Sequence, residues 1–300
     1  MNIRIVSASA VTAVLAVGIG AIAANAADPG LQVALLTPQQ SDSGAPQALA
    51  AEAEILTLSA PPRDSEDEGR RRFEPLAQYL SKTLGKKVVY RHPGNWGVYQ
   101  GAMQKGAYDL VFDGPHFNGW RMEKLNYNVL VKAPGDFSQV VVVRKNSTTV
   151  DIKRLAGHKI CAHAPPNLGT LILQGAFDNP ARQPLIAVVH GYKHIYQALL
   201  DGKCEAAVLP KKHLEKFDRE RNAMRIVYQS KPLPNQALSA GPKISAEDRE
   251  RIAAALLAPE AAAPTAKMRE VYMGGKSFVT TNNAEYAGLA QYLRNEWGYY

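Results

Sequence analysis

The sequence predicts an α/β fold with two lobes and a ligand cleft between them. Short apolar strands alternate with helices from about residue 55 to residue 297. Such alternation predicts mostly parallel, doubly wound sheets with helices on both faces. Two strands, within residues 108–121 and 159–170, run into turns that open a helix. Two turns of this kind in one chain favour a cleft between two lobes.

The N-terminal segment indicates export. Residues 1–26 hold one charge, Arg4, followed by an apolar run and the small-residue exit Ala24-Asn25-Ala26. This pattern is typical of a secretory signal peptide, with cleavage after Ala26 and a periplasmic destination. A membrane anchor is the alternative, but the apolar run is shorter than the ~20 residues that a span needs. Residues 27–54 are rich in Ala, Gln, Pro and Ser, which predicts a flexible linker.

The elements are assigned in chain order. Lobe 1 is expected from residues 55–142 and 233–300, with strands at 55–59, 87–91, 109–112 and 129–132 and helices at 66–84, 96–104 and from Pro115. A strand over 139–144 is apolar enough to be buried or to cross between the lobes. Lobe 2 is expected from residues 143–232, with strands at 159–164, 185–190 and 204–209 and helices at 168–177 and 194–201. Ser245 is a good N-cap for a helix over 245–257, and a last helix is predicted over 283–297.

The two turns carry the predicted binding chemistry. Asp113-Gly114 forms a sharp turn, and Pro115 is suited to a first helical position because its missing N–H has no partner there. The second turn, Pro165-Pro166-Asn167, also leads into a helix. A helix N-terminus attracts anions through its unpaired N–H groups and partial positive charge. The turns therefore favour an anionic ligand.

Several segments are informative through their order and spacing together, namely FEPLAQYL (73–80), YDLVFDGP (108–115), LAGHK (155–159), GYKH (191–194), DGKCEAA (201–207), SFV (277–279) and Tyr286. On these segments the chain, from about residue 55 to residue 297, resembles a known family, the phosphonate-, phosphite- and phosphate-binding periplasmic proteins of ABC transporters. The resemblance implies a type II periplasmic binding protein with two hinge-linked lobes and two crossing strands. It also implies a monomer that delivers a small, anionic ligand to an inner-membrane permease. A subunit that reports to a membrane kinase is the alternative.

The chain departs from the family at the second turn. Members that bind phosphonates carry a Ser-Thr-Ser-Gly-like turn, whereas residues 165–170 keep only the Gly and the Thr. Asp113 also places a carboxylate at the predicted cleft, which repels an anion unless the carboxylate is neutralised or turned away. These departures predict a ligand other than simple methyl- or aminoethylphosphonate.

The predicted ligand-binding residues lie at or beyond strand ends, where open parallel sheets bind ligands. They are Pro61, Arg63, Trp96, Asp113, Gly114, Pro115, His116, Phe117, Asn167, Leu168, Gly169, Thr170, Tyr192 and His194. Arg121 either pairs with an anionic ligand, caps its helix or balances Asp113. An alternative is a metal site assembled from Asp113, His116, His163, His190 and His194, because imidazole and carboxylate suit zinc, copper or iron.

Other features narrow the function class. Without a nucleophile elbow, His-Glu-x-x-His or phosphate-loop signature, the chain is not predicted to be an enzyme or to need a cofactor. Its net charge of +8 is spread along the chain, and export argues against nucleic acid. Cys161 and Cys204 are the only cysteines and fall on strands that the doubly wound order makes neighbours. They predict a disulfide in an oxidising compartment, with two buried free thiols as the alternative.

Overall fold

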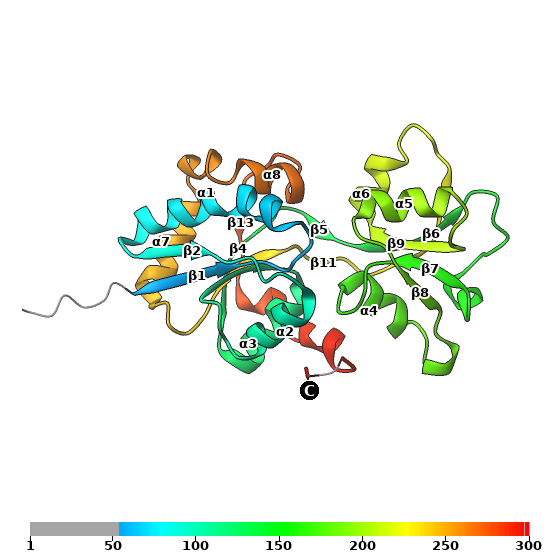
Figure 1. Cartoon of the computed structure of the whole chain (residues 1–300), viewed down its shortest axis with the longest axis horizontal. Helices are drawn as coiled ribbons and strands as arrows, with labels where there is room; N and C mark the ends of the chain where they lie inside the picture. Colours follow the sequence, from blue (N-terminus) through cyan, green and yellow to red (C-terminus); the bar gives the residue numbers. More distant parts are fainter. Residues whose placement is uncertain (1–53, 297, 300) are drawn as a thin grey trace, which may run out of the picture. The chain divides into compact units, whose positions relative to one another are not determined.

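Two sheets flanked by helices organise the protein in the computed structural model, which describes residues 54–296, 298 and 299 (Figure 1). The first sheet has the order β13-β4-β12-β3-β1-β2. Its strands are β1 (Ile55–Ser59), β2 (Lys87–Tyr90), β3 (Leu110–Asp113), β4 (Asn128–Lys132), β12 (Ala237–Ala240) and β13 (Val279–Thr280). The predicted signal peptide, and the linker up to residue 53, lie outside the described residues.

The second sheet has the order β10-β6-β9-β7-β8. Its strands are β6 (Gln139–Arg144), β7 (Lys159–Ala162), β8 (Leu185–Val188), β9 (Ala206–Pro210) and β10 (Met224–Gln229). The chain passes between the sheets at β5 (Asp136–Phe137) and β11 (Leu233–Pro234), which pair antiparallel with each other. One strand in each sheet follows directly after a connecting segment, β6 after β5 and β12 after β11, and it runs antiparallel to both of its neighbours. β1 is parallel to β2 and β3, and β7 is parallel to β8 and β9. The predicted α/β class is confirmed.

Helices cover both faces of each sheet, as Figure 1 shows. On the first sheet α1 (Glu66–Leu84), α7 (Ala246–Leu257) and α8 (Ala266–Tyr272) lie opposite α2 (Trp96–Gln104) and α3 (Pro115–Leu125). On the second sheet α5 (Tyr192–Leu200) and α6 (Lys211–Phe217) lie opposite α4 (Leu168–Gly175). Alternate side chains of β6 point to opposite faces of the second sheet. Val140 and Val142 pack with α5, while Val141 and Val143 pack with α4.

Local sequence signals set the ends of the helices that frame the site. Ser65 caps α1 in a reciprocal capping box with Glu68, and Gly85 ends the helix in the left-handed conformation. Asn95 caps α2 by accepting a hydrogen bond from the Val98 amide. These two helices begin at the residues that the sequence predicts, because their caps are encoded within a few positions of the helix start.

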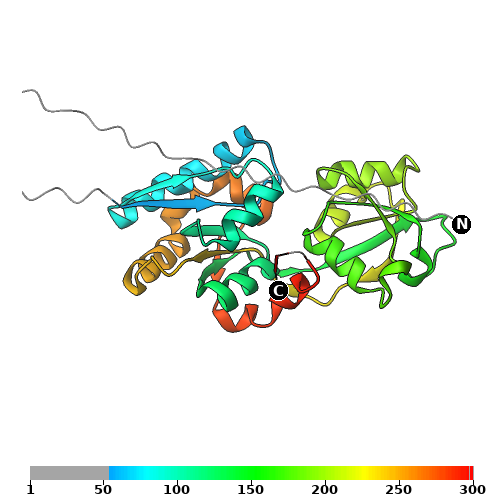
Figure 2. The same ribbon diagram turned by 60° about the horizontal axis from the view of Figure 1, so that its bottom comes forward.

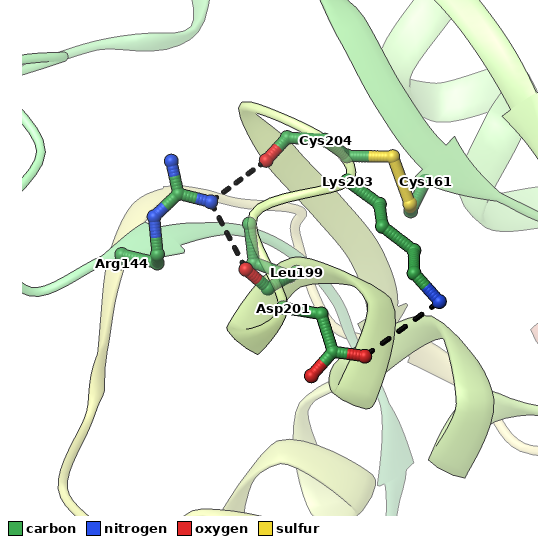
Figure 3. Close-up of a disulfide and its surroundings, with 6 residues drawn as sticks. All are labelled: Arg144, Cys161, Leu199, Asp201, Lys203 and Cys204. Carbon is green, nitrogen blue, oxygen red and sulfur yellow. Dashed lines mark hydrogen bonds and ion pairs between the residues drawn. A yellow bond between two sulfur atoms is a disulfide. The ribbon is translucent and has the colours of Figure 1, made fainter.

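The predicted disulfide is confirmed. Cys161 on β7 and Cys204, two residues before β9, are bonded with their Cα atoms 5.7 Å apart. The two strands are parallel neighbours, which brings the cysteines together. Figure 3 shows Arg144 beside the bond, where its Nη1 donates to the carbonyl oxygens of Cys204 and Leu199.

The C-terminal segment differs from its prediction. Instead of one helix over 283–297, it forms the 3-10 turns η4 (Asn283–Tyr286) and η5 (Leu289–Leu293), which pack against α3 and are coloured red in Figure 2. Gly288 between them has φ 74°, so the left-handed backbone interrupts a continuous helix. Three further short 3-10 turns are η1 (Ile152–Leu155), η2 (Pro180–Arg182) and η3 (Pro259–Ala262).

The strands absent from the sequence-based assignment are β5, β10, β11, β12 and β13. β10 has a strand-like composition, Met-Arg-Ile-Val-Tyr-Gln, whereas the other four are short. The buried β12 reads Ala-Leu-Ser-Ala and is short of the β-branched and aromatic residues typical of strands. It is a strand because β3 and β4 pair with it on either side. No helix within the described part of the chain is both long enough and apolar enough to span a membrane.

Candidate functional site

A small cavity joins elements of both sheets. Its residues come from the β1–α1 loop, α2, the start of α3, the two connecting segments and the first turns of α4 and α5. They are Arg63, Trp96, Gly114, His116, Phe117, Phe137, Gln139, Asn167, Leu168, Tyr192 and Gln236. The cavity volume is about 20 Å³, roughly the space of one water molecule. A larger ligand therefore requires the surrounding elements to move apart.

The start of α3 presents backbone donors to this cavity. Gly114 precedes the helix without a side-chain cap, and Pro115 occupies a first-turn position. The first helical N–H groups have no acceptor within a helix. His116 and Phe117, which occupy these positions, both line the cavity. A Cβ at Gly114 would lie 3.0 Å from His116 Cε1, so glycine allows the imidazole to fold back over the turn.

The Asp113 carboxylate is hydrogen-bonded to groups of the protein and is not directed toward a ligand. Its side chain is completely buried, and Oδ1 accepts hydrogen bonds from Arg63 Nη2 at 3.2 Å and from the Gly114 amide at 2.6 Å. Oδ2 accepts from Arg121 Nη1 at 3.0 Å and from the Tyr99 hydroxyl. Asp113 is thus the neutralised carboxylate that the sequence left open, and Arg121 balances it.

The charges of this cluster do not cancel. Two guanidinium groups, Arg63 and Arg121, face one carboxylate, Asp113, which leaves one positive charge. Arg121 is fully buried and lies outside the cavity lining, whereas Arg63 contributes to the lining. Arg63 Nη1 is buried and has no hydrogen-bond partner among the residues that the structure describes. The unpaired donor and the excess charge therefore coincide at Arg63.

His116 is held as a neutral imidazole. Burial lowers its pKa to about 4, and Nε2 lies 3.0 Å from the carbonyl oxygen of Pro166. A carbonyl only accepts, so Nε2 carries the proton and Nδ1 presents a lone pair. Nδ1 is buried and has no hydrogen-bond partner within residues 54–296, 298 and 299. This contact also connects the start of α3 with the turn before α4.

The turn before α4 uses most of its own donors. The Asn167 side chain caps the helix by accepting from the Gly169 amide at 3.0 Å, and its Nδ2 donates to the Tyr192 hydroxyl at 3.3 Å. The Thr170 hydroxyl donates to the His163 carbonyl at 2.6 Å and does not line the cavity. The Tyr192 proton is free to reach a ligand because that hydroxyl accepts from Asn167.

Unpartnered polar atoms concentrate at the cavity. Seven buried side-chain nitrogen or oxygen atoms have no hydrogen-bond partner within the described residues. Five of them belong to four cavity residues: Arg63 Nη1, His116 Nδ1, Gln139 Nε2 and Oε1, and Gln236 Oε1. Buried polar groups are otherwise almost always paired. A ligand in this cavity could therefore complete the hydrogen bonds of these five atoms.

The structure brings together eight of the fourteen residues expected to bind the ligand: Arg63, Trp96, Gly114, His116, Phe117, Asn167, Leu168 and Tyr192. Pro61, Asp113, Pro115, Gly169 and Thr170 stand outside the lining and support the residues in it. His194 is exposed, and its Nδ1 contacts the His190 carbonyl at 3.0 Å.

Three lining residues were not predicted: Phe137, Gln139 and Gln236. Gln139 had a usable signal, because it is the polar first residue of an otherwise apolar valine strand. Gln236 had none, since it lies in the irregular turn between β11 and β12.

The alternative metal site is not assembled. No group of three or more His, Cys, Asp or Glu side chains that could hold a metal ion occurs in the part of the chain that the structure describes. The Asp113 carboxylate forms ion pairs with Arg63 and Arg121. His190 and His194 are exposed.

The comparisons with known proteins agree with this geometry. The family model described as "ABC transporter, phosphonate, periplasmic substrate-binding protein" matches residues 58–286, about three quarters of the chain. The "Phosphate-import protein PhnD" of Mycolicibacterium smegmatis is 26% identical over 244 residues, which cover 72% of this chain and 75% of that protein.

Solved structures show the same fold at low sequence identity. PhnD1 of Prochlorococcus marinus in complex with methylphosphonate has a TM-score of 0.63 and 16% identity, over 80% of this chain and 97% of that one. A Xanthomonas citri protein bound to ATP has a TM-score of 0.63 and 14% identity, over 80% and 98% of the two chains. A binding protein component of an ABC phosphonate transporter from Pseudomonas aeruginosa has a TM-score of 0.58 and 10% identity, over 78% and 84%.

Proposed function

Because the chain belongs to the periplasmic substrate-binding proteins of ABC-type phosphonate transporters, we propose that its cavity binds a small organophosphorus or phosphorus oxyanion for uptake. The family is a substrate-binding transporter component and not an enzyme, and it acts in the periplasm or outside the cell. Such a component works with a membrane permease. We further propose that residues 1–26 direct export and that the mature protein acts as a monomer.

The observation that carries the proposed ligand class is the unpaired Arg63 Nη1 in a cluster with one excess positive charge. A guanidinium nitrogen suits a phosphorus oxyanion, because charge-assisted hydrogen bonds to such groups are short and strong. The free N–H groups at the start of α3 add donors and a partial positive charge. These three features support the proposal that the ligand is anionic.

The small cavity supports binding by opening and closing. A volume of about 20 Å³ is too small for a phosphonate, so the ligand enters when the elements around it separate. The paired segments β5 and β11 connect the two sheets and are short enough to act as a hinge. Closure around the ligand would then present one defined conformation to the permease.

The test is calorimetric titration of the purified, metal-free protein with methylphosphonate, phosphite and inorganic phosphate. We expect saturable binding of at least one of these ligands and a raised melting temperature without turnover. Arg63→Met should weaken binding at least about tenfold, because a hydrogen bond to a charged group contributes about 1.5–3 kcal/mol. Arg71→Met is the matched control, since Arg71 is exposed on α1.

The Arg63 variant is expected to fold, because Asp113 keeps Arg121, Tyr99 and the Gly114 amide as partners. Failure of all three ligands to bind the folded wild-type protein would overturn the proposed ligand class. Equal ligand affinity of the wild-type protein and Arg63→Met would show that Arg63 does not bind the ligand.

A further inference from the structure

Two glutamines on the segments that connect the sheets share an unusual property. Gln139 begins β6 and is 2% exposed, and Gln236 lies between β11 and β12 and is 7% exposed. Both line the cavity. Both amide atoms of Gln139 and the Oε1 atom of Gln236 are buried without a partner in the described protein. An unpaired buried amide is costly, which indicates that a bound group completes these hydrogen bonds.

Hydrogen bonds anchor the backbones of both glutamines beside the cavity. Gln139 exchanges hydrogen bonds with Ser230, donating to its Oγ at 3.0 Å and accepting from its amide at 2.9 Å. The Gln236 carbonyl accepts from the Ala133 amide at 2.8 Å. Gly169 makes room for the first side chain, because a Cβ there would lie 2.8 Å from Gln139 Oε1.

The surroundings define the group that these amides can receive. A carbonyl oxygen such as Oε1 requires a donor, and a fully deprotonated alkylphosphonate has none. An ammonium group would supply one, but the nearby carboxylate, Asp113, already accepts four hydrogen bonds and is paired with two arginines. A neutral hydroxyl both donates and accepts. It therefore matches the amides without adding a charge.

We propose that Gln139 and Gln236 form a subsite for the hydroxyl group of a hydroxyalkylphosphonate whose phosphonate is anchored at Arg63. This inference deepens the proposed function and rests on it. The aromatic side chains of Trp96, Phe117 and Phe137 line the same cavity and enclose the carbon chain. Methylphosphonate fits the anchor but leaves the amide oxygens unpaired.

The test compares hydroxymethylphosphonate, methylphosphonate and aminomethylphosphonate by calorimetry at about pH 9, where the phosphonate group is almost fully dianionic. At this pH the phosphonate no longer donates, so the hydroxyl is the donor that distinguishes the first ligand from the second. We expect hydroxymethylphosphonate to bind the wild-type protein at least tenfold more tightly than either of the others.

Substitution by methionine keeps the side-chain length and removes the hydrogen bonds. Gln139→Met and Gln236→Met should each reduce the hydroxyl preference, which is the ratio of the hydroxymethylphosphonate affinity to the methylphosphonate affinity, by about fivefold or more. Gln78→Met on the exposed face of α1 is the matched control and should keep the full preference. Retained methylphosphonate binding shows that a variant is folded.

Each outcome bears on a different claim. If all three ligands bind the wild-type protein equally, the glutamine subsite is refuted and the oxyanion function stands. A preference for aminomethylphosphonate would also refute it, because a cation would then be recognised. Failure of every phosphonate to bind overturns both proposals. The wild-type comparison decides the question even if a methionine variant does not fold.

Discussion

We expect the negative charge of Asp113 to stabilise the binding site, because it compensates the positive charges of the two arginines that pair with it. Asp113→Asn keeps the size of the side chain and removes its charge. The wild-type carboxylate accepts from Arg63, Gly114, Tyr99 and Arg121. The asparagine amide nitrogen is itself a donor, so it would face two of these donors instead of accepting from them. The buried Arg121 would lose its counter-charge.

The size of the effect follows from burial. Both Asp113 and Arg121 side chains are completely buried, and Arg63 is 16% exposed. Removing one partner of a buried ion pair lowers the free energy of unfolding by about 3–5 kcal/mol. For a domain of about 150–250 residues, each 1 kcal/mol shifts the melting temperature by about 2–4 °C. We therefore expect the melting temperature to fall by about 6–20 °C.

The assay is thermal and urea-induced unfolding, with Asp136→Asn on the exposed side of β5 as the matched control. The variant gains one uncompensated positive charge, so methylphosphonate should raise its melting temperature more than it raises that of the wild type. A loss below about 1 kcal/mol, equal to that of the control, would refute the conclusion that Asp113 compensates the two arginines.

Three further outcomes are expected. Cys161→Ser, which leaves Cys204 unpaired, should lower the free energy of unfolding by about 2–5 kcal/mol, measured by urea denaturation. The free energy of unfolding should fall as the pH is lowered from about 6.5 toward about 4, because burial lowers the pKa of His116 to about 4 in the folded protein and the unfolded chain binds the proton first. In acid denaturation, His116→Gln should make the free energy of unfolding less dependent on pH over this range. His194→Ala should leave ligand affinity within about twofold by calorimetry, because His194 is exposed and lies outside the cavity lining.

Each of these outcomes has a clear opposite. Two reactive thiols in denatured, unreduced wild-type protein would contradict the disulfide. His163 and His213 also have pKa values lowered to about 4 by burial, so an unchanged slope in His116→Gln would assign the acid sensitivity to them. A tenfold weaker ligand affinity in His194→Ala would place that imidazole in the site.

The sequence predicts the order of the elements well where the signals are local. Ser245 is the N-cap of α7 as expected, and α1 and α2 begin at the predicted residues, where the structure shows Ser65 and Asn95 as their caps. Residues within one helical turn of each other decide such features. By contrast, β12 lies at the centre of its sheet without a strand-like composition, because its pairing partners are more than 100 positions away.

Within the site, the turn Asp113-Gly114-Pro115 could be found from the sequence, but the role of its carboxylate could not. The sequence alone shows an acidic residue at a predicted cleft, and this suggests a ligand of opposite charge. The partners that reverse this conclusion are Arg63, 50 residues before it, and Arg121, 8 residues after it. Only the sheet order brings Arg63 to Asp113.

The sequence by itself determined the α/β class, the family resemblance, the starts of α1, α2, α3, α4 and α7 and the two cysteines that pair, because each depends on short-range pattern or on residue type. The tertiary structure decided which polar atoms remain unpaired. Gln139 and Gln236 are separated by almost 100 residues and come together because β5 pairs with β11. Whether a buried amide has a partner depends on the whole packing around it, and no local pattern contains that information.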